Sequence, residues 1–160
     1  MKYTSIIIKL RKIIRSINLD SKRIEKEFQV SIPQLLTLQY LSEQPDYKAQ
    51  STKIKSYLNL NASTMSGIIK RLQSKSLVAR LPNTKDKRAF DITLTAKGAD
   101  LLKEQPMTIQ NKLSTNLTKL PKEEIINLEK YIDLLIDLMD AENIDASPFM
   151  TTNELNDAKY

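Results

Sequence analysis

The chain has no cysteine, no histidine and only two glycines among its 160 residues. Without cysteine there are no disulfide bonds and no thiolate chemistry, and without either residue there is no Cys/His zinc site. Acid–base catalysis by imidazole is excluded as well, and two glycines are too few for a phosphate-binding glycine loop. No Asp, Glu, Lys or Ser pair stands in a glycine-rich or cleft-forming context. We therefore expect no catalytic site, no cofactor and no bound metal.

Long hydrophobic runs are also missing. Near the start, Ile6, Ile7 and Ile8 form an uninterrupted apolar run that Lys9 ends. Such a run is too short for the apolar region of a signal peptide and far too short to span a bilayer. The sequence thus predicts a cytoplasmic protein without a membrane segment. Its length suits a single domain that buries its own core without disulfides.

Charge is distributed unevenly around a net value of +6. Residues 48–103 contain 12 Lys and Arg against 3 Asp and Glu, whereas residues 122–160 contain 3 against 10. A basic central region is typical of a part that binds a polyanion such as nucleic acid. The alternative is an ordinary surface of solvated lysines, and charge alone does not separate the two.

Apolar spacing predicts a series of helices interrupted once by strands. Helices are expected over 4–28, from the cap Ser31 to near Gln44, over 51–58 and over 62–75, because apolar residues recur there every three or four positions. Period-two alternation predicts strands over 77–81 and 89–94, joined by the polar loop 82–88. The residues expected to face the core are Leu35, Leu38, Leu41, Ile54, Tyr57, Leu58, Met65, Ile68, Ile69, Leu72, Phe90, Ile92 and Leu94.

The chain returns to helix after the second strand. Thr95 is placed to cap this helix, Pro106 interrupts it, and Pro121 is a favoured first residue for the last helix. Two helices joined by a short turn and followed directly by a hairpin make a winged helix-turn-helix. We therefore predict a mainly α fold with a small β-hairpin wing. Its winged helix-turn-helix would cover 31–99, its helical dimerisation region 1–30 and 100–141, and its frayed or disordered tail 142–160.

The last helix carries an apolar seam whose members are three and four residues apart, a spacing suited to contact with another helix. Together with the apolar stripe of helix 4–28, this seam is more surface than one small winged domain covers. The sequence therefore predicts a homodimer, and packing of these helices within a monomer is the alternative. The seam comprises Ile125, Leu128, Ile132, Leu135 and Met139.

The opposite face of helix 62–75 is polar and basic, and it is the candidate DNA-reading surface. A helix fits the major groove, where small hydroxyls approach bases or phosphates and longer cations reach guanine or the backbone. Cations in loop 82–88 suit a narrow minor groove. A solvated helix face and a solubilising loop tip are the alternatives. The candidate DNA-binding residues are Ser63, Thr64, Ser66, Gly67, Lys70, Arg71, Lys85, Lys87 and Arg88.

Two of these positions raise specific hypotheses. Asp86 is an acid in a loop expected to face phosphates, so we expect it to brace the wing by bonding Arg71 or a neighbouring wing arginine. Gly67 lies inside a helix, where glycine costs about 0.5–1 kcal/mol relative to alanine. Close approach of DNA or of another backbone would explain its presence.

Three segments together resemble the MarR family of bacterial transcription regulators. Residues 78–83 read V-A-R-L-P-N, residues 86–88 read D-K-R, and residues 94–98 read L-T-A-K-G, which is similar to the family's wing signature. Residues 62–72 resemble its recognition helix, and the order of elements over about residues 4–141 matches too. Many family members carry arginine where this chain has Gly67, so that contact is absent here.

The resemblance implies a homodimeric repressor that binds a pseudo-palindromic operator in double-stranded DNA. Helix 62–75 would enter the major groove, wing 82–88 would enter the minor groove, and a small aromatic or anionic effector would release the DNA from a site we leave unassigned. Sensing through thiols is excluded, because the chain has no cysteine. The remaining alternative is a winged-helix module that binds protein rather than DNA.

Overall fold

The computed structural model of the chain describes residues 2–83, 89–104 and 106–144. The described chain divides into two compact units, the first ending at Pro106 and the second beginning at Met107. We call these the winged unit and the C-terminal unit. Residues 84–88 of the predicted wing and residues 145–160 of the predicted tail lie outside the described part.

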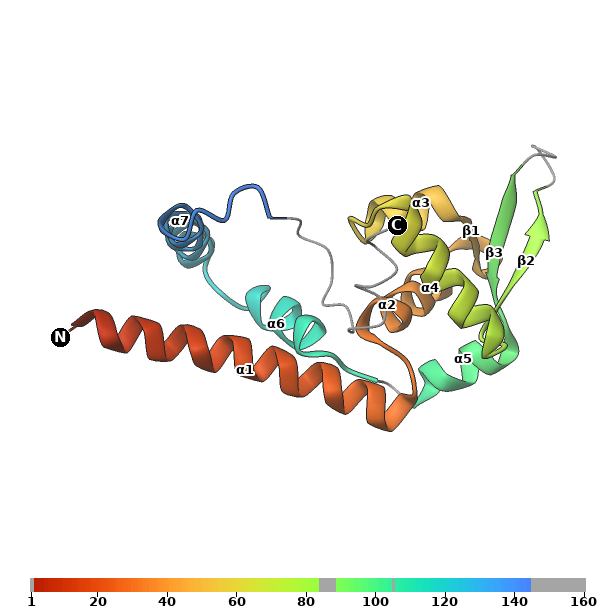
Figure 1. Cartoon of the computed structure of the whole chain (residues 1–160), viewed down its shortest axis with the longest axis horizontal. Helices are drawn as coiled ribbons and strands as arrows, with labels where there is room; N and C mark the ends of the chain where they lie inside the picture. The colour runs from red at the N-terminus through yellow and green to blue at the C-terminus, as the bar shows by residue number, and fades with distance from the viewer. Residues whose placement is uncertain (1, 84–88, 105, 145–160) are drawn as a thin grey trace. The chain divides into compact units, whose positions relative to one another are not determined.

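The winged unit is mainly helical with a small antiparallel sheet, which confirms the predicted fold class (Figure 1). The helices and strands expected from the sequence form with shifts of one or two residues at their ends. In chain order the elements are α1 (Lys2–Phe28), α2 (Ile32–Ser42), the 3₁₀ turn η1 (Pro45–Tyr47), β1 (Lys48–Gln50), α3 (Ser51–Tyr57), α4 (Ala62–Ser74), β2 (Val78–Pro82), β3 (Phe90–Leu94) and α5 (Ala96–Lys103).

The predicted helix caps are confirmed. A side-chain oxygen just before each helix accepts a hydrogen bond from a backbone N–H of the first turn, which has no partner within the helix. Ser31 forms a full capping box with Gln34 at the start of α2. The other two caps are Asn61, which accepts from the N–H of Thr64, and Thr95, which accepts from the N–H of Gly98.

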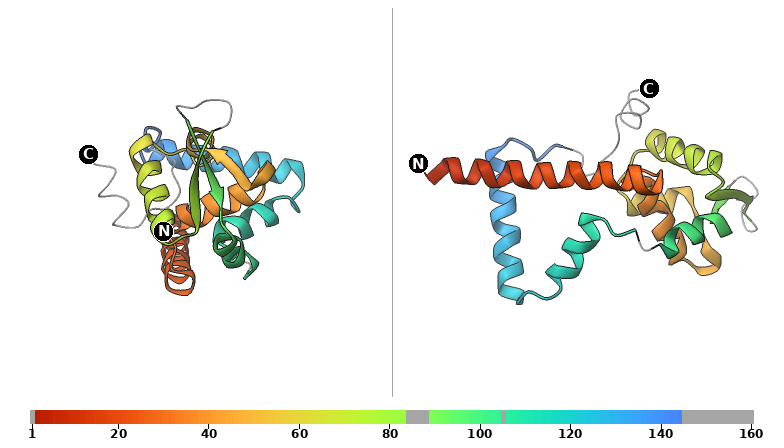
Figure 2. Two further views of the ribbon diagram at one scale, coloured as in Figure 1. Left: turned by 90° about the vertical axis from the view of Figure 1, so that its right-hand side faces the viewer. Right: turned by 90° about the horizontal axis from the view of Figure 1, so that it is seen from below.

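The sheet has three strands in the order β1–β3–β2, one strand more than the sequence predicted. The missing strand was β1, whose three residues are too few and too polar to show an alternating pattern. β1 pairs with one edge of β3 and β2 with the other, so that Ala49 and Arg80 both lie opposite Ile92. Strands β2 and β3 run out beyond the helices of the unit as a hairpin (Figures 1 and 2).

One hydrophobic core holds the winged unit together. Leu35, Leu38 and Leu41 of α2 are fully buried, as predicted, and the inward residues of α3 and α4 pack into the same cluster. Tyr57 is a correction, because its side chain is 60% exposed. Helix α3 makes only two turns, and Ile54 already fills its inward face; Tyr57 instead places its ring 4.5 Å from that of Tyr40.

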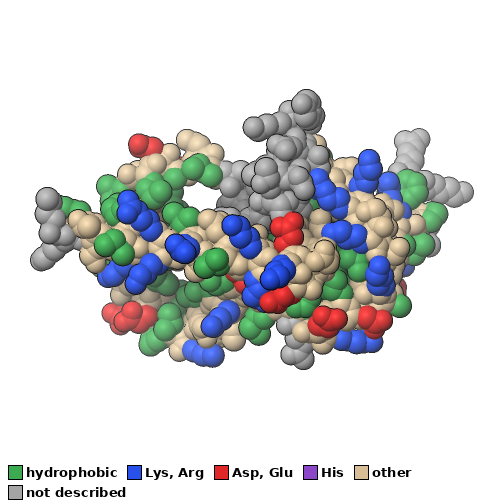
Figure 3. Space-filling view, turned by 60° about the horizontal axis from the view of Figure 1, so that its bottom comes forward, with side chains coloured by type: hydrophobic (Ala, Val, Ile, Leu, Met, Phe, Trp, Pro, Cys, Tyr) green, Lys and Arg blue, Asp and Glu red, His purple; other side chains and the backbone are tan. Residues whose placement is uncertain are grey.

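Helix α1 leaves this core as a straight rod (Figure 2). Its C-terminal end is anchored, since Ile24 is fully buried and Phe28 packs against the core. Its N-terminal half is exposed, including Ile6 and Ile13 of the predicted stripe. Hydrophobic and basic side chains lie together over this helix (Figure 3).

The C-terminal unit contains α6 (Ile109–Leu117) and α7 (Lys122–Leu138). The predicted interruption at Pro106 is confirmed, because α5 ends before it and α6 begins after it, capped by Thr108. Pro121 is the N-cap of α7 rather than its first helical residue, a shift of one position. Within the described residues, no helix combines the length and the apolar character needed to cross a membrane.

Candidate nucleic-acid interface

Helix α4 presents a polar outer face because its apolar residues all turn inward. Met65, Ile68, Ile69 and Leu72 are buried in the core, and this leaves the positions between them on the surface. Ser63, Ser66 and Lys70 are exposed, while Gly67 and Arg71 are half-buried.

Thr64 does not belong to this face, and its predicted contact with DNA is wrong. Its side chain is 2% exposed, so it cannot reach a base or a phosphate. Its position in the helix places it one step before Met65 and four before Ile68, on the edge of the inward face. Within the described residues its hydroxyl oxygen has no hydrogen-bond partner.

The C-terminal end of α4 is fixed by side chains from the surrounding helices. The ammonium of Lys75 donates to the backbone carbonyl of Gln29 at 2.5 Å and to the side-chain oxygen of Gln34 at 3.3 Å. The backbone carbonyl of Lys75 in turn accepts from the ammonium of Lys97 at 2.9 Å. Helix α4 is therefore tied to the end of α1, the start of α2 and the start of α5.

The hairpin beside α4 has an amide–carboxylate pair next to its tip. Asn83 donates from its side chain to Asp91 at 2.8 Å and from its backbone to the carbonyl of Ala89 at 3.1 Å. The alternating pattern predicts Asp91 on the outer side, but the residue is only 8% exposed, and its carboxylate accepts the hydrogen bond from Asn83. The predicted tip residues Lys85, Asp86, Lys87 and Arg88 lie outside the described residues, so the proposed Asp86 brace stays a prediction.

A stacked pair that sequence reasoning did not assign lies further along the hairpin. The guanidinium carbon of Arg80 lies 4.5 Å from the ring centroid of Phe90, a distance typical of a cation–π contact. Both residues are exposed, which corrects the prediction that Phe90 faces the core: it lies at the tip end of β3, beyond the core residue Ile92. The alternation of side chains along a strand could have identified Arg80. It is two residues beyond the buried Val78 and therefore lies on the same face of the sheet.

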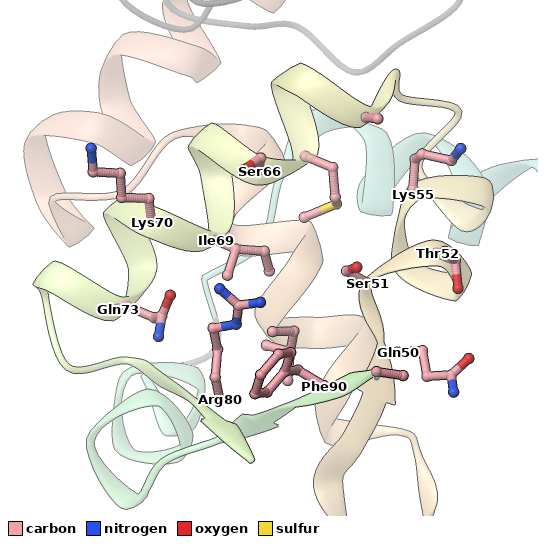
Figure 4. Close-up of a pocket in the computed structure, with 14 residues that line it drawn as sticks. Gln50, Ser51, Thr52, Lys55, Ser66, Ile69, Lys70, Gln73, Arg80 and Phe90 are labelled. Carbon is pink, nitrogen blue, oxygen red and sulfur yellow. The ribbon is translucent and has the colours of Figure 1, made fainter. Parts of the chain in front are cut away.

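A groove of about 660 Å³ separates α4 from the hairpin and ends at the start of α3 (Figure 4). Its floor is apolar, and among the described residues its polar lining contains three cationic side chains and no carboxylate. Figure 4 shows Arg80 pointing from the hairpin toward α4, with Phe90 beside it. The polar residues of the groove are Gln50, Ser51, Thr52, Lys55, Ser66, Lys70, Gln73 and Arg80.

The basic groups with shifted pKa values lie outside this groove. The hydrogen bond to Asp20 raises the pKa of Arg23 on α1, and the hydrogen bond to Asp100 raises the pKa of Lys103 on α5. Both cations form ion pairs with carboxylates of their own helices. Among the described residues, no cluster of acidic side chains is suited to hold a metal ion.

The fold and the exposed basic face of α4 define a winged helix-turn-helix protein. The sequence profile described as the MarR family matches residues 30–90. The uncharacterised HTH-type transcriptional regulator YsmB of Bacillus subtilis (strain 168) is 30% identical over 121 residues, which cover 76% of this chain and 82% of YsmB. The chain belongs to the MarR family, which confirms the resemblance seen in its sequence.

Solved structures of this family share the fold. The S. aureus MepR–DNA complex matches with a TM-score of 0.63 and 21% identity over 81% of this chain and 95% of MepR. Sco3205, a MarR family regulator from Streptomyces coelicolor in complex with DNA, matches with a TM-score of 0.61 and 18% identity over 90% and 96% of the two chains. The chain is a transcriptional regulator of this family rather than an enzyme.

Proposed function

We propose that the chain is a homodimeric repressor that reads a pseudo-palindromic operator with α4 in the major groove and the hairpin tip in the adjacent minor groove. The observation that carries this proposal is the outer face of α4, where Ser63, Ser66 and Lys70 are exposed beside a groove whose described lining residues include no carboxylate. Small hydroxyls allow close approach to base edges, and the ammonium of Lys70 reaches a guanine or a phosphate. Half-buried Gly67 permits the same close approach in the middle of the face.

Fluorescence anisotropy with a labelled duplex from upstream of the protein's own gene tests this proposal, with a scrambled duplex beside it. With about 6–10 phosphate contacts, affinity should fall roughly 10³–10⁵-fold between about 50 and 200 mM salt. Lys70→Ala should weaken binding, whereas the matched Lys103→Ala should not, because Lys103 lies outside the groove and is already paired with Asp100. If the wild type bound no duplex even at low salt, a protein-binding winged module would replace this proposal.

The homodimer is supported by the apolar surface of α7. Ile125, Leu128, Ile132 and Met139 of the predicted seam are between 36% and 58% exposed, and Leu135 is half-buried. A seam of this spacing is stable in water when a second helix covers it. Two recognition helices in such a dimer would lie about 34–36 Å apart, one turn of DNA.

Sedimentation equilibrium of the full chain tests the dimer directly. Ile132→Glu places a charge in the middle of the seam, and we expect it to shift the species from dimer to monomer. Lys130→Glu changes charge on the same helix outside the seam and serves as the control. A wild-type protein that stays monomeric at high micromolar concentration would contradict the dimer.

Release by a small aromatic or anionic effector is part of the proposal and rests on family membership. Titration of benzoate into the preformed protein–operator complex, with acetate as the non-aromatic control, checks it. Loss of anisotropy with benzoate and not with acetate is the expected result. Oxidation of thiols is excluded as the trigger, since the chain has no cysteine.

A further inference from the structure

If α4 and the hairpin bind DNA as proposed above, the groove between them faces one particular part of the DNA. This inference therefore rests on the proposed function. A sugar–phosphate strand separates each major groove from the next minor groove. If α4 lies in the major groove and the hairpin tip lies in the minor groove, one such strand must cross between them. The cavity of about 660 Å³ lies at that crossing.

The lining of the groove suits a phosphodiester. Lys55 comes from α3, Lys70 from α4 and Arg80 from β2, so each wall of the groove contributes one cation. Hydroxyl and amide groups lie between these cations, and none of the described lining residues is an acid that would repel a phosphate. Phosphate contacts of this kind fix the position of a protein on DNA without reading its sequence.

Arg80 is the groove cation for which the structure gives an aromatic contact. On β2 it lies opposite Ile92, two residues inward from the pair formed by Pro82 and Phe90, so that Arg80 and Phe90 share the face that looks toward α4. The guanidinium carbon of Arg80 lies over the ring of Phe90, 4.5 Å from its centroid. A guanidinium has five N–H donors, so one in contact with a ring can still donate to two phosphate oxygens at once.

Among the described residues, no other role for the Phe90 side chain is evident from its contacts. It is 45% exposed, whereas its neighbour Ile92 on the same face is 2% exposed and belongs to the core. Single exposed hydrophobic residues are common on protein surfaces, so we infer a role for Phe90 from the contact of its ring with Arg80 rather than from its exposure. Support of Arg80 accounts for its place.

We propose that Arg80 binds the phosphodiester strand that crosses between α4 and the hairpin, and that Phe90 is a positioning residue that acts through Arg80. Neither residue would read sequence. Together they would set how deeply the strand seats between the two reading elements. Loss of the stack would leave Arg80 charged but free to turn away from the groove.

The test is a double-mutant cycle measured by anisotropy on the operator and on the scrambled duplex. Arg80→Ala should weaken both by about tenfold, as expected for one charge-assisted contact, and should lower the slope of log affinity against log salt by about 1. Phe90→Ala should weaken both about two- to fivefold. In the Arg80→Ala background, Phe90→Ala should cause no further loss.

Leu81→Ala is the matched control for Phe90→Ala. Leu81 is also a large exposed residue of the hairpin, at 46% against 45%, but it lies on the opposite face of the sheet. We expect Leu81→Ala to leave binding unchanged. Phe90→Tyr keeps an aromatic ring and should bind like the wild type, whereas Phe90→Leu keeps apolar bulk without a ring and should behave like Phe90→Ala.

Four results would overturn this inference. Equal loss from Phe90→Ala with and without Arg80 would mean that Phe90 acts on its own. A change in the ratio of operator to scrambled affinity would make Arg80 a base-reading residue. Normal binding by Arg80→Ala, with Lys70→Ala still impaired, would remove the groove contact and leave the proposed function standing; a wild type that binds no duplex removes both.

Discussion

The two units of the chain use apolar residues in opposite ways. In the winged unit, the buried hydrophobic side chains from Ile24 to Ile92 form one core that joins α1, α2, α3, α4 and the sheet. In the described residues of the C-terminal unit, no hydrophobic side chain is buried, although α7 carries isoleucine and leucine along much of its length. Both units therefore contain many apolar residues. They differ in whether those residues have packing partners within their own unit.

The difference shows what each helix needs from its surroundings. Short helices such as α3 are marginal in water and form because the core covers them. Helix α7 has the same requirement, but its cover must come from outside its own unit. In the proposed homodimer, the second copy of the chain supplies that cover. The following substitutions distinguish the buried apolar residues of the winged unit from the exposed apolar residues of α7.

Leu38→Ala and Ile132→Ala should give the largest contrast. Leu38 is fully buried in α2, so its truncation should lower the free energy of unfolding by about 2–5 kcal/mol at any protein concentration. Ile132 is 47% exposed, so its truncation should act mainly on association and make the unfolding midpoint more dependent on concentration. Urea unfolding at two protein concentrations measures both. An equal, concentration-independent loss for the two variants would mean that α7 packs within its own chain.

Gly98→Ala should have the next largest effect, a decrease in the free energy of unfolding. A Cβ on Gly98 would lie 2.3 Å from the backbone oxygen of Leu77 and 2.7 Å from a methyl of Leu94. A backbone carbonyl cannot move aside cheaply, so we expect a loss of about 1–3 kcal/mol in thermal unfolding.

Gly67 is an ordinary helical position without positive φ. Alanine there should therefore stabilise the fold by about 0.5–1 kcal/mol while weakening operator binding. Stabilisation with normal binding would refute the close-approach hypothesis for Gly67.

Thr64→Val tests the corrected position on α4. The buried hydroxyl of Thr64 lacks a partner among the described residues, and valine has nearly the same shape without the polar group. We expect a gain of about 1 kcal/mol in the free energy of unfolding, with unchanged operator affinity. A loss of affinity without a change in stability would restore Thr64 to the DNA-reading face.

Ser76→Gly should have the smallest effect. Ser76 follows the C-cap of α4 with φ of 59°, and the N–H groups of Ser76 and Leu77 bond back to Gln73 and Leu72, the pattern of a Schellman motif. Glycine adopts this left-handed backbone without strain, so we expect a stabilisation of about 0.5–1 kcal/mol in chemical unfolding. Ser74→Gly, inside the helix, should destabilise and provides the control.

Local signals were strong enough to predict most of the winged unit. Apolar residues three and four apart identified the inward faces of α2 and α4, and Ser31, Asn61 and Thr95 marked where helices begin. These features depend on helix geometry and on first-turn N–H groups that need an acceptor. They are fixed within a few residues of sequence, so they can be read without knowing the fold.

Other features depend on which segments meet in space. Strand β1 exists because the central strand β3 offers it an edge, and Thr64 is buried because the core surrounds that side of α4. The stack of Arg80 on Phe90 joins two strands whose register no single segment specifies.

The sequence by itself thus determined the order of the helices and of the two hairpin strands, the helix caps, the family and the polar face of α4. The tertiary structure alone decided which of those polar residues reach the surface and which cations share a groove. The physical reason is distance along the chain: periodicity and capping act within one or two turns, whereas burial, strand register and the groove lining arise between residues far apart in sequence.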